Sequence, residues 1–474
     1  MAPAQLAVFL VAAALATIAV AALYVPGAAR IFLIAQTAHW SLSYVARPVV
    51  LLWVQPLPNF GDNVPDPRLY DYGYDKGIHD VLQPVIFGLW VYAGLVIAYV
   101  LWTRLRGIPC KGESATRPVP FAGDPIFAQT LFVLYVIGTL GRLAAYATGT
   151  TGKAGELESP SPIINLVTIM ATLGAVGLIV FYRNDNARST LLVVGGLTCG
   201  ELVWTAIVQS KTPIMGAALA IAVRFAMIGW TRVRVAGVLS ITAVAIGGFG
   251  WLQSLKTDAA AKADAAQVDA QYPTVVHPFL SMLRRFDLLE AATDSWFAGP
   301  SSWLTPGQVA LHSFQSLIPT QLLGADKFRS GAAWAEQVRG RSVDMSTVEV
   351  SLAEGNINEG YVLGGYIGVA VGVTITFVML LIWSRALYSR YLALAILGLS
   401  VIEVPVLFER GILGTVEMLG KYLQAVVLAW LTYLLVGEYR RRVDQLSGPP
   451  LGARVTPPRT GVQRTGKQRT AQWV

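Results

Sequence analysis

Positively charged and acidic side chains stand within or beside apolar stretches of this 474-residue chain. Arg142, Glu201 and Lys211 belong to three different stretches. Ionisable groups are costly in a lipid environment, so residues of this kind mark candidate functional sites. Arginine binds phosphate oxygens through two parallel hydrogen bonds, lysine supplies a compact charge, and a carboxylate can accept a proton. Together these residue types favour chemistry on an anionic substrate.

The composition identifies the elements that must position these charges. The chain is 54% hydrophobic and only 14% charged, with a mean hydropathy of +0.54, whereas soluble domains are about a quarter charged. Crossing a hydrocarbon layer of about 30 Å takes about 20 apolar residues in a helix. We therefore expect an all-α integral membrane protein. Eleven stretches meet this requirement: 5–24, 31–54, 85–103, 127–147, 163–182, 189–208, 212–230, 235–252, 360–383, 391–408 and 412–436.

The distribution of lysine and arginine predicts the orientation of these spans. The short loops on one side hold eleven basic residues, against five on the other side, where acidic residues accompany them. The more basic side is therefore expected to be cytoplasmic, which places the N-terminus outside the cytoplasm and the C-terminus inside. Residues 437–474 are basic and poor in apolar side chains, which predicts a disordered cytoplasmic tail rather than a nucleic-acid-binding surface.

The predicted spans divide the chain into four parts. Residues 1–252 form eight spans, 253–359 form one large extracytoplasmic loop, 360–436 form three more spans, and 437–474 form the tail. Connections as long as the large loop commonly carry functional sites. Within it, residues 307–323 alternate apolar and polar side chains in a helical rhythm, which predicts a helix along the membrane surface.

Charged residues inside the spans gather in the halves nearest the extracytoplasmic side: Arg47, Arg142, Glu201, Glu403, Glu417 and Lys421. Arg224 lies near a cytoplasmic end, where we expect it to reach the lipid headgroups. A carrier of ions or protons needs such groups near the midplane, with access from both sides. The one-sided placement instead favours chemistry at the outer leaflet on an anionic, lipid-linked molecule. Glu417 and Lys421, four residues apart, can alternatively neutralise each other.

Metal and disulfide chemistry is not expected. The four histidines have no metal-ligand spacing. Cys110 falls in a predicted loop and Cys199 inside a predicted helix, so the two cysteines give no disulfide framework. We therefore expect neither a metal nor a cofactor.

Three segments of the large loop resemble a known family. They are "RRFDLLEAATD" at 284–294, "LIPTQLLGADKFRSG" at 317–331 and "SLAEGNINEGYVLGGYIGVAVG" at 351–372. In this order they resemble the outer-loop signature of O-antigen polymerases and related oligosaccharide repeat-unit polymerases (Wzy-type). The chain departs from the pattern at Thr320, Gly324 and Phe328, where the family often has arginine, tryptophan and proline. These departures leave the identity of the substrate open.

The resemblance implies a glycosyltransferase with GT-C-like architecture in a bacterial plasma membrane. The donor would be a glycan on polyprenyl diphosphate and the acceptor a sugar hydroxyl of another lipid-linked repeat unit. Such enzymes generally need no metal and no nucleotide sugar, and a partner protein that regulates chain length is implied. Membrane lipids would surround the enzyme.

Site residues follow from the charge that such a reaction develops. Negative charge grows on the departing diphosphate, and preorganised cations must meet it. The expected substrate-binding residues are Lys211, Arg142, Arg285, Lys327, Arg329 and Glu201. Glu354 and Glu359, beside the glycines that open the next helix, are the first candidates for a general base, and Asp287 is a third. Gly364, Gly365 and Gly368 can alternatively serve close helix packing.

Two other functions stay open from the sequence. An O-antigen ligase would move a finished glycan to a different acceptor, although this chain has Asn356 and Asn358 where a histidine would favour that activity. A transporter or flippase for a polyprenyl-linked glycan would need a cationic cavity open to both sides of the membrane.

Overall fold

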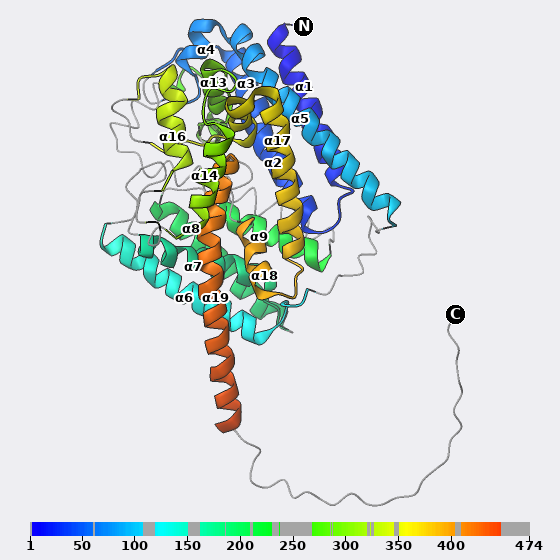
Figure 1. Ribbon diagram of the computed structural model, residues 1–474, viewed down its shortest axis with the longest axis vertical. Coiled ribbons are helices and arrows are strands. Elements are labelled where there is room, and N and C mark those ends of the chain that lie inside the picture. The colour runs from blue at the N-terminus through cyan, green and yellow to red at the C-terminus, as the bar shows by residue number, and fades with distance from the viewer. Residues whose placement is uncertain are drawn as a thin grey trace, which may run out of the picture.

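The computed structural model describes residues 2–59, 62–107, 119–149, 162–184, 186–208, 212–229, 237, 268–284, 286, 288–319, 323, 327–345, 350–402 and 409–446 (Figure 1).

Six helices in these ranges are long and apolar enough to cross a membrane: α1 (Pro3–Ala22), α5 (Tyr74–Leu105), α6 (Pro125–Ala147), α8 (Ala187–Val208), α17 (Asn356–Ala386) and α19 (Ile412–Leu446). Two shorter apolar helical stretches are Leu166–Phe181, within α7 (Pro162–Phe181), and α9 (Thr212–Ile228). The predicted all-helical class is confirmed for these ranges, and the apolar helices support the transmembrane character. The number of eleven spans stays a prediction, and span 235–252 lies almost wholly outside the described residues.

Helices α1 and α5 run side by side in the same direction (Figure 1). At one end the amide of Ala4 donates to Asp75 at 3.4 Å, and at the other the Arg104 guanidinium lies 4.6 Å from the ring centre of Tyr24. Buried alanines line α1, and small side chains let membrane helices approach closely. We call the end that carries the N-terminus and α4 (Pro67–Tyr72) the loop end, and the end where α19 finishes the tail end.

A continuous helical path follows α1. It consists of α2 (Ala28–Ser41), the π-helical turn η1 (Leu42–Ala46) and α3 (Arg47–Val54), so the predicted span 31–54 is helical. Pro48 has no N–H, and its ring conflicts with the carbonyl of Tyr44 four residues earlier. A wider π turn relieves that conflict, and such turns recur at functional sites.

Glycines bring α6 and α7 into backbone contact. A Cβ added at Gly138 would lie 2.0 Å from the backbone nitrogen of Ala171, and one added at Gly174 would lie 2.7 Å from the carbonyl oxygen of Leu131. Any larger side chain at these positions would push the two helices apart. Helices α8 and α9 both pack against α7.

Arg224 of α9 is buried between helices. Its Nη1 donates to the carbonyl oxygens of Ile179 at 2.8 Å and Tyr182 at 2.6 Å, at the end of α7. Unpaired carbonyl groups at a helix C-terminus carry partial negative charge, which attracts a cation. The prediction that Arg224 reaches the lipid headgroups is therefore wrong, because the end of α7 supplies its acceptors.

Two segments far apart in the sequence form one packed unit at the loop end. Residues 55–73 contribute α4, and residues 268–345 contribute α12 (His277–Leu283), α13 (Leu288–Ala298), α14 (Pro306–Leu317), α16 (Ser330–Gln337) and η2 (Arg339–Arg341). We call the described residues of these two segments the loop assembly. The large loop predicted at 253–359 thus contains several helices where it is described.

A buried carboxylate joins three parts of the loop assembly. Asp294 of α13 is fully buried and accepts hydrogen bonds from Arg68 at 2.7 Å, from Arg339 at 2.9 Å and from the indole of Trp334 at 3.1 Å. Removing one partner of such a network would leave a buried charge uncompensated, which is strongly unfavourable. The network therefore fixes α4, α13 and α16 relative to one another.

Helix α14 corresponds to the helical rhythm found at 307–323. A capping box at Thr305 and Gln308 starts it. It packs along the first turns of α19 (Figure 1), and a Cβ at Gly420 of α19 would lie 2.1 Å from the carbonyl oxygen of Ser316. The helix is confirmed, and Gly420 lets α14 pack directly on α19. Its position along the membrane surface stays a prediction.

The element α17 consists of two helical pieces joined by a tight turn at Gly364 and Gly365. Gly365 has φ +57° and ψ −144°, a conformation that glycine adopts readily and other residues rarely do. Residues 356–363 fold back along the second piece, because Asn356 donates to Thr376 at 3.1 Å and a Cβ at Gly368 would lie 2.0 Å from the carbonyl oxygen of Gly360. We call residues 356–376 the glycine hairpin. The predicted span at 360–383 therefore starts with a reversal of the chain, which the glycines make possible.

Helix α18 (Leu392–Ser400) covers the first part of the predicted span 391–408, and residues 403–408 of that span lie outside the described residues. One prediction near the C-terminus needs correction. Helix α19 continues to Leu446, into the predicted disordered tail. The Glu438–Arg442 ion pair at 3.1 Å supports this last part of the helix. No proline interrupts the sequence between Ile412 and Pro449. The rest of the tail, 447–474, lies outside the described residues.

We expect Gly368→Ala to destabilise the protein by about 1–3 kcal/mol, because the new methyl group would overlap the Gly360 carbonyl and open the hairpin. The measurement is the thermal unfolding midpoint of the full chain in detergent. Gly94→Ala in α5 is the matched control, since a Cβ there has no heavy atom within 4 Å. Equal midpoints for the two variants would contradict the close packing of the hairpin.

Candidate functional site

The carboxylate of Glu359 lies at the N-terminus of α19. Its Oε1 accepts from the Leu413 amide at 3.1 Å, and its Oε2 accepts from the Ile412 amide. The first amides of a helix have no partner within the helix, and a negative charge there is favourable. Glu359 is fully buried, so both of its oxygens serve to attach the glycine hairpin to α19.

Glu354 is the second buried carboxyl of this region. It lies two residues before the hairpin and is fully buried, and its Oε2 is 3.5 Å from the Gly411 amide. Its Oε1 has no hydrogen-bond partner among the described residues. Burial raises the pKa of Glu354, although the nearby positive charge of Arg410 opposes this effect. Glu354 thus has one oxygen that can accept a proton from another group.

Cations surround the start of α19. Arg410 precedes the helix and interacts electrostatically with both Glu354 and Glu417. Lys327 donates to the carbonyl oxygen of Ser316 at 3.1 Å, and burial lowers the pKa of Lys327. Arg329, the N-cap residue of α16, also interacts with Glu417. Three positively charged residues from two segments therefore lie around the first two turns of α19.

The pair of Glu417 and Lys421 is neutralised within α19. Lys421 Nζ lies 3.0 Å from Glu417 Oε1, one helical turn away. The interpretation of these two residues as a local ion pair is confirmed. With Glu417 partnered by Lys421, the cations Lys327, Arg329 and Arg410 remain near the start of α19, where the acidic residues are Glu354, Glu359 and Glu409.

The helical path from α2 to α3 forms another wall beside Glu354. Tyr44 accepts a hydrogen bond from Asn358 at 3.3 Å, and a Cβ at Gly355 would lie 3.7 Å from the Tyr44 hydroxyl. His39 Nε2 lies 3.7 Å from Glu409 Oε1, and the Glu409 carbonyl accepts from the Gly355 amide at 2.8 Å. The segment around Glu354 is therefore held between α19 and this path.

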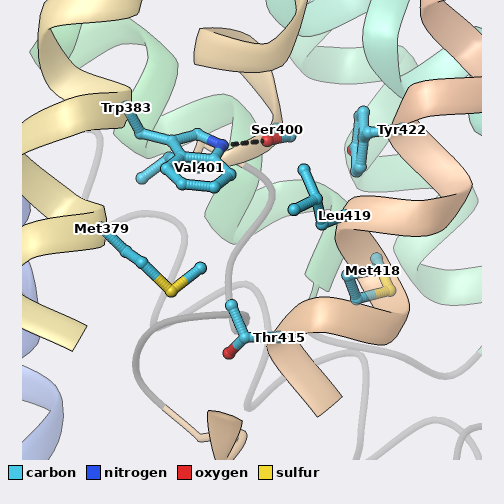
Figure 2. Close-up of a pocket in the computed structure, with 8 residues that line it drawn as sticks. All are labelled: Met379, Trp383, Ser400, Val401, Thr415, Met418, Leu419 and Tyr422. Atoms are coloured by element: carbon cyan, nitrogen blue, oxygen red, sulfur yellow. Dashed lines mark hydrogen bonds between the residues drawn. The ribbon is translucent and has the colours of Figure 1, made fainter. Parts of the chain in front are cut away.

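An apolar hollow lies one turn farther along α19. Figure 2 shows it between α17, α18 and α19, where Met379, Trp383, Met418 and Tyr422 line its walls. Thr415 lies at its edge and donates to the carbonyl of Gly411 at 2.8 Å. The cavity volume is about 10 Å³, which is room for about one water molecule. Methionine side chains are flexible and can repack around a ligand.

Arg142 and Glu201 meet between α6, α7 and α8. The guanidinium lies 2.7 Å and 3.1 Å from the two carboxylate oxygens, and it donates to Thr172 at 2.8 Å. The ring of Trp204 lies 5.1 Å from the guanidinium carbon. Both charged side chains are buried. Glu201 therefore neutralises the charge that the sequence analysis assigned to substrate binding.

The predicted site residues fall into three groups. Lys327, Arg329, Glu354 and Glu359 are brought together around the start of α19. Arg142 and Glu201 form the ion pair between α6 and α8. Lys211, Arg285 and Asp287 lie outside the described residues, as does Glu403.

Sequence reasoning did not select Arg410, Tyr44 or Asn358 as site residues. Arg410 stands directly before Gly411 and the apolar run that begins α19. This position could have identified Arg410 as a site residue. Tyr44 and Asn358 are 314 residues apart in the sequence. Their contact depends on the tertiary fold and leaves no local pattern.

Comparison with known proteins found no matching family model, no matching curated protein and no matching solved structure. The functional argument therefore depends on the chemistry of the site. A buried carboxyl, whose Oε1 has no hydrogen-bond partner among the described residues, lies beside the positive charge of Arg410. A carboxylate in this position can remove a proton from a hydroxyl, and nearby cations can stabilise an anionic group.

We expect Arg142→Met or Glu201→Gln to lower the free energy of unfolding by about 3 kcal/mol, because each change leaves a buried charge without its partner. The double variant R142M/E201M should lose much less than the sum of the two single effects. Unfolding is measured in detergent with the full chain.

The control for this cycle is the exposed pair of Glu438 and Arg442, with side chains 53% and 72% exposed. An exposed pair of this kind contributes at most about 1 kcal/mol. If Glu201→Gln were no more harmful than Glu438→Gln, Arg142 would not depend on Glu201 and would be available to a ligand.

Proposed function

We propose that the protein is a glycosyltransferase of a bacterial plasma membrane that joins lipid-linked oligosaccharide repeat units. It transfers a glycan from a polyprenyl-diphosphate donor to a sugar hydroxyl of a lipid-linked acceptor. The observation that carries the proposal is Glu354, a buried carboxyl with an available oxygen beside Arg410 and the start of α19. The resemblance of 284–294, 317–331 and 351–372 to repeat-unit polymerases supports it.

The reaction makes one bond and breaks another at the anomeric carbon of the donor. The acceptor oxygen forms a bond to that carbon while the bond between the carbon and the diphosphate oxygen breaks, and the bonding electrons leave with the diphosphate. The proton of the acceptor hydroxyl passes to Glu354. Negative charge grows on the leaving group, and fixed cations lower the free energy of that transition state.

Each charged residue of the site has a place in this scheme. Arg410, Lys327 and Arg329 bind the diphosphate, and Glu354 acts as the general base. Glu359 is a positioning residue, because its carboxylate fixes the start of α19. The cations Lys211 and Arg285, proposed from the sequence, would complete the anion site, and Asp287 remains an alternative base.

The apolar hollow of Figure 2 adjoins the start of α19 on the side toward the tail end, but its volume of about 10 Å³ admits about one water molecule. The polyprenyl chain of a substrate would therefore lie outside this hollow. The lysine and arginine distribution predicts that the loop assembly lies on the extracytoplasmic side. The donor and acceptor would therefore meet at the outer leaflet.

Deletion of the protein from its source bacterium should remove long surface glycan chains while single repeat units remain, because the units are still made and exported. The measurement is electrophoresis of extracted surface glycan. Finished polymer left on its lipid carrier would instead identify a ligase, and accumulation of units in the cytoplasmic leaflet would identify a flippase.

We expect Glu354→Gln to lower the rate of transfer by about 10²–10⁴-fold, the usual contribution of a general base. The substitution keeps the size of the side chain and removes its ability to take the proton. The assay uses the full chain in liposomes with lipid-linked repeat units. Glu336→Gln is the matched control, because Glu336 is an exposed residue of α16.

The pH profile of transfer provides a second readout of the same role. A base must be deprotonated, so transfer should fall as the pH drops through the pKa of Glu354. Burial raises that pKa above the ordinary value of 4.5, so the loss should begin above this pH. Full activity of Glu354→Gln, with an unchanged acid limb, would exclude Glu354 as the base.

A further inference from the structure

Arg47 is a buried arginine held by carbonyl groups. Its side chain belongs to the first turn of α3, and the residue is 1% exposed. Nε donates to the carbonyl of Val64 at 3.2 Å, and Nη2 donates to the carbonyl of Asn63. These two bonds to consecutive carbonyls fix the plane and direction of the guanidinium. Nη1 is buried and has no hydrogen-bond partner in the described part of the chain.

The positive charge of Arg47 has no carboxylate partner among the described residues. Asp62 is the nearest acidic residue in the sequence to those carbonyls, but its two oxygens accept from Arg284 at 3.1 Å and from Tyr272 at 2.7 Å. Buried charges in proteins are normally paired, because an unpaired one is very costly. A fixed guanidinium with unused donors and no counter-ion therefore indicates a bound anion.

Ser43 adds a second unused polar group on the same face. It lies one turn before Arg47, is fully buried, and its hydroxyl has no partner in the described ranges. The two residues flank the π turn η1, and π turns are frequent where a helix forms a binding site. A hydroxyl and a guanidinium one turn apart suit the oxygens of a phosphate group.

The Arg47 face is connected to the proposed base. Tyr44, between Ser43 and Arg47, receives the hydrogen bond of Asn358 and lies against Gly355, the residue after Glu354. The proposed donor cations, Arg410 and Lys327, lie instead toward α19 and α14. Glu354 therefore lies near Arg410, and the segment that carries it contacts the helical path that contains Arg47.

We propose that Arg47 and Ser43 form a second anion site, which binds the diphosphate of the lipid-linked acceptor. This inference rests on the proposed function, because two lipid-linked substrates bring two diphosphates to one base. The site at Arg410 and Lys327 holds the donor, and the site at Arg47 and Ser43 holds the acceptor.

The first test counts anion sites with radiolabelled inorganic pyrophosphate and the full chain in phosphatidylcholine nanodiscs. The wild type should bind two pyrophosphates per chain, and Arg47→Gln should bind one. Arg410→Gln should weaken the other site and leave the Arg47 site intact. Two bound pyrophosphates of unchanged affinity in Arg47→Gln would overturn the inference.

A second variant covers the case in which Arg47→Gln does not fold. Ser43→Ala removes one hydroxyl and keeps the guanidinium with its carbonyl contacts. It should weaken one pyrophosphate site by about 10-fold or more, since a lost hydrogen bond to a charged group contributes about 1.5 kcal/mol or more. Unchanged affinity at both sites in this variant would also overturn the inference.

The headgroups of anionic phospholipids share the chemistry of the proposed ligand, so the count is repeated in nanodiscs of phosphatidylglycerol. Two bound pyrophosphates there support the acceptor assignment. If the pyrophosphate dependent on Arg47 no longer bound in phosphatidylglycerol, the site would take membrane headgroups, and the acceptor assignment would be wrong.

Transfer kinetics separate this inference from the proposed function. Arg47→Lys keeps a charge but loses the fork, and it should raise the KM for the acceptor about 10-fold with the KM for the donor unchanged. Equal effects on both values would contradict the acceptor role. If the wild type bound two pyrophosphates but transferred no glycan, the proposed function would fail while the anion site remained.

Discussion

The start of α19 inside the protein is the constraint on which the candidate site depends. Its first amides lie away from water and need acceptors, and Glu359 supplies both oxygens. Glu359 can reach these amides because the chain reverses at Gly364 and Gly365. The reversal places residues 356–363 beside the second piece of α17, with Gly360 against Gly368 and Asn356 bonded to Thr376. One carboxylate thus joins the glycine hairpin to α19 and brings Glu354 beside Arg410.

The loop assembly keeps this hairpin in place from the loop end. Buried Asp294 holds α4, α13 and α16 together through Arg68, Arg339 and Trp334. The same assembly reaches the hairpin directly, where the amides of Ser301 and Trp303 donate to the carbonyls of residues 361 and 362. Each charge of the Asp294 network is paired, so the network favours one arrangement of these helices. A preorganised site requires rigid surroundings of this kind.

The buried charges of the protein divide according to their partners. Arg142 is neutralised by Glu201, Lys421 by Glu417, and Arg224 by the carbonyl end of α7. These contacts account for the stability of charges among apolar helices. Arg47 differs, because within the described chain its charge has neither a carboxylate partner nor the C-terminus of a helix, and Glu354 differs because its Oε1 accepts no hydrogen bond there. That difference, rather than the presence of charge alone, separates candidate binding groups from structural ones.

The sequence by itself determined the all-helical class, the positions of most apolar helices and four residues that meet at one site: Lys327, Arg329, Glu354 and Glu359. Apolar length and helical periodicity are local properties, so they can be read from neighbouring residues. The fold alone decided that Arg142 pairs with Glu201 and that α14 lies along α19. Each of these outcomes depends on contacts between residues distant in the sequence, where close glycine packing and charge pairing select among partners that local patterns cannot distinguish.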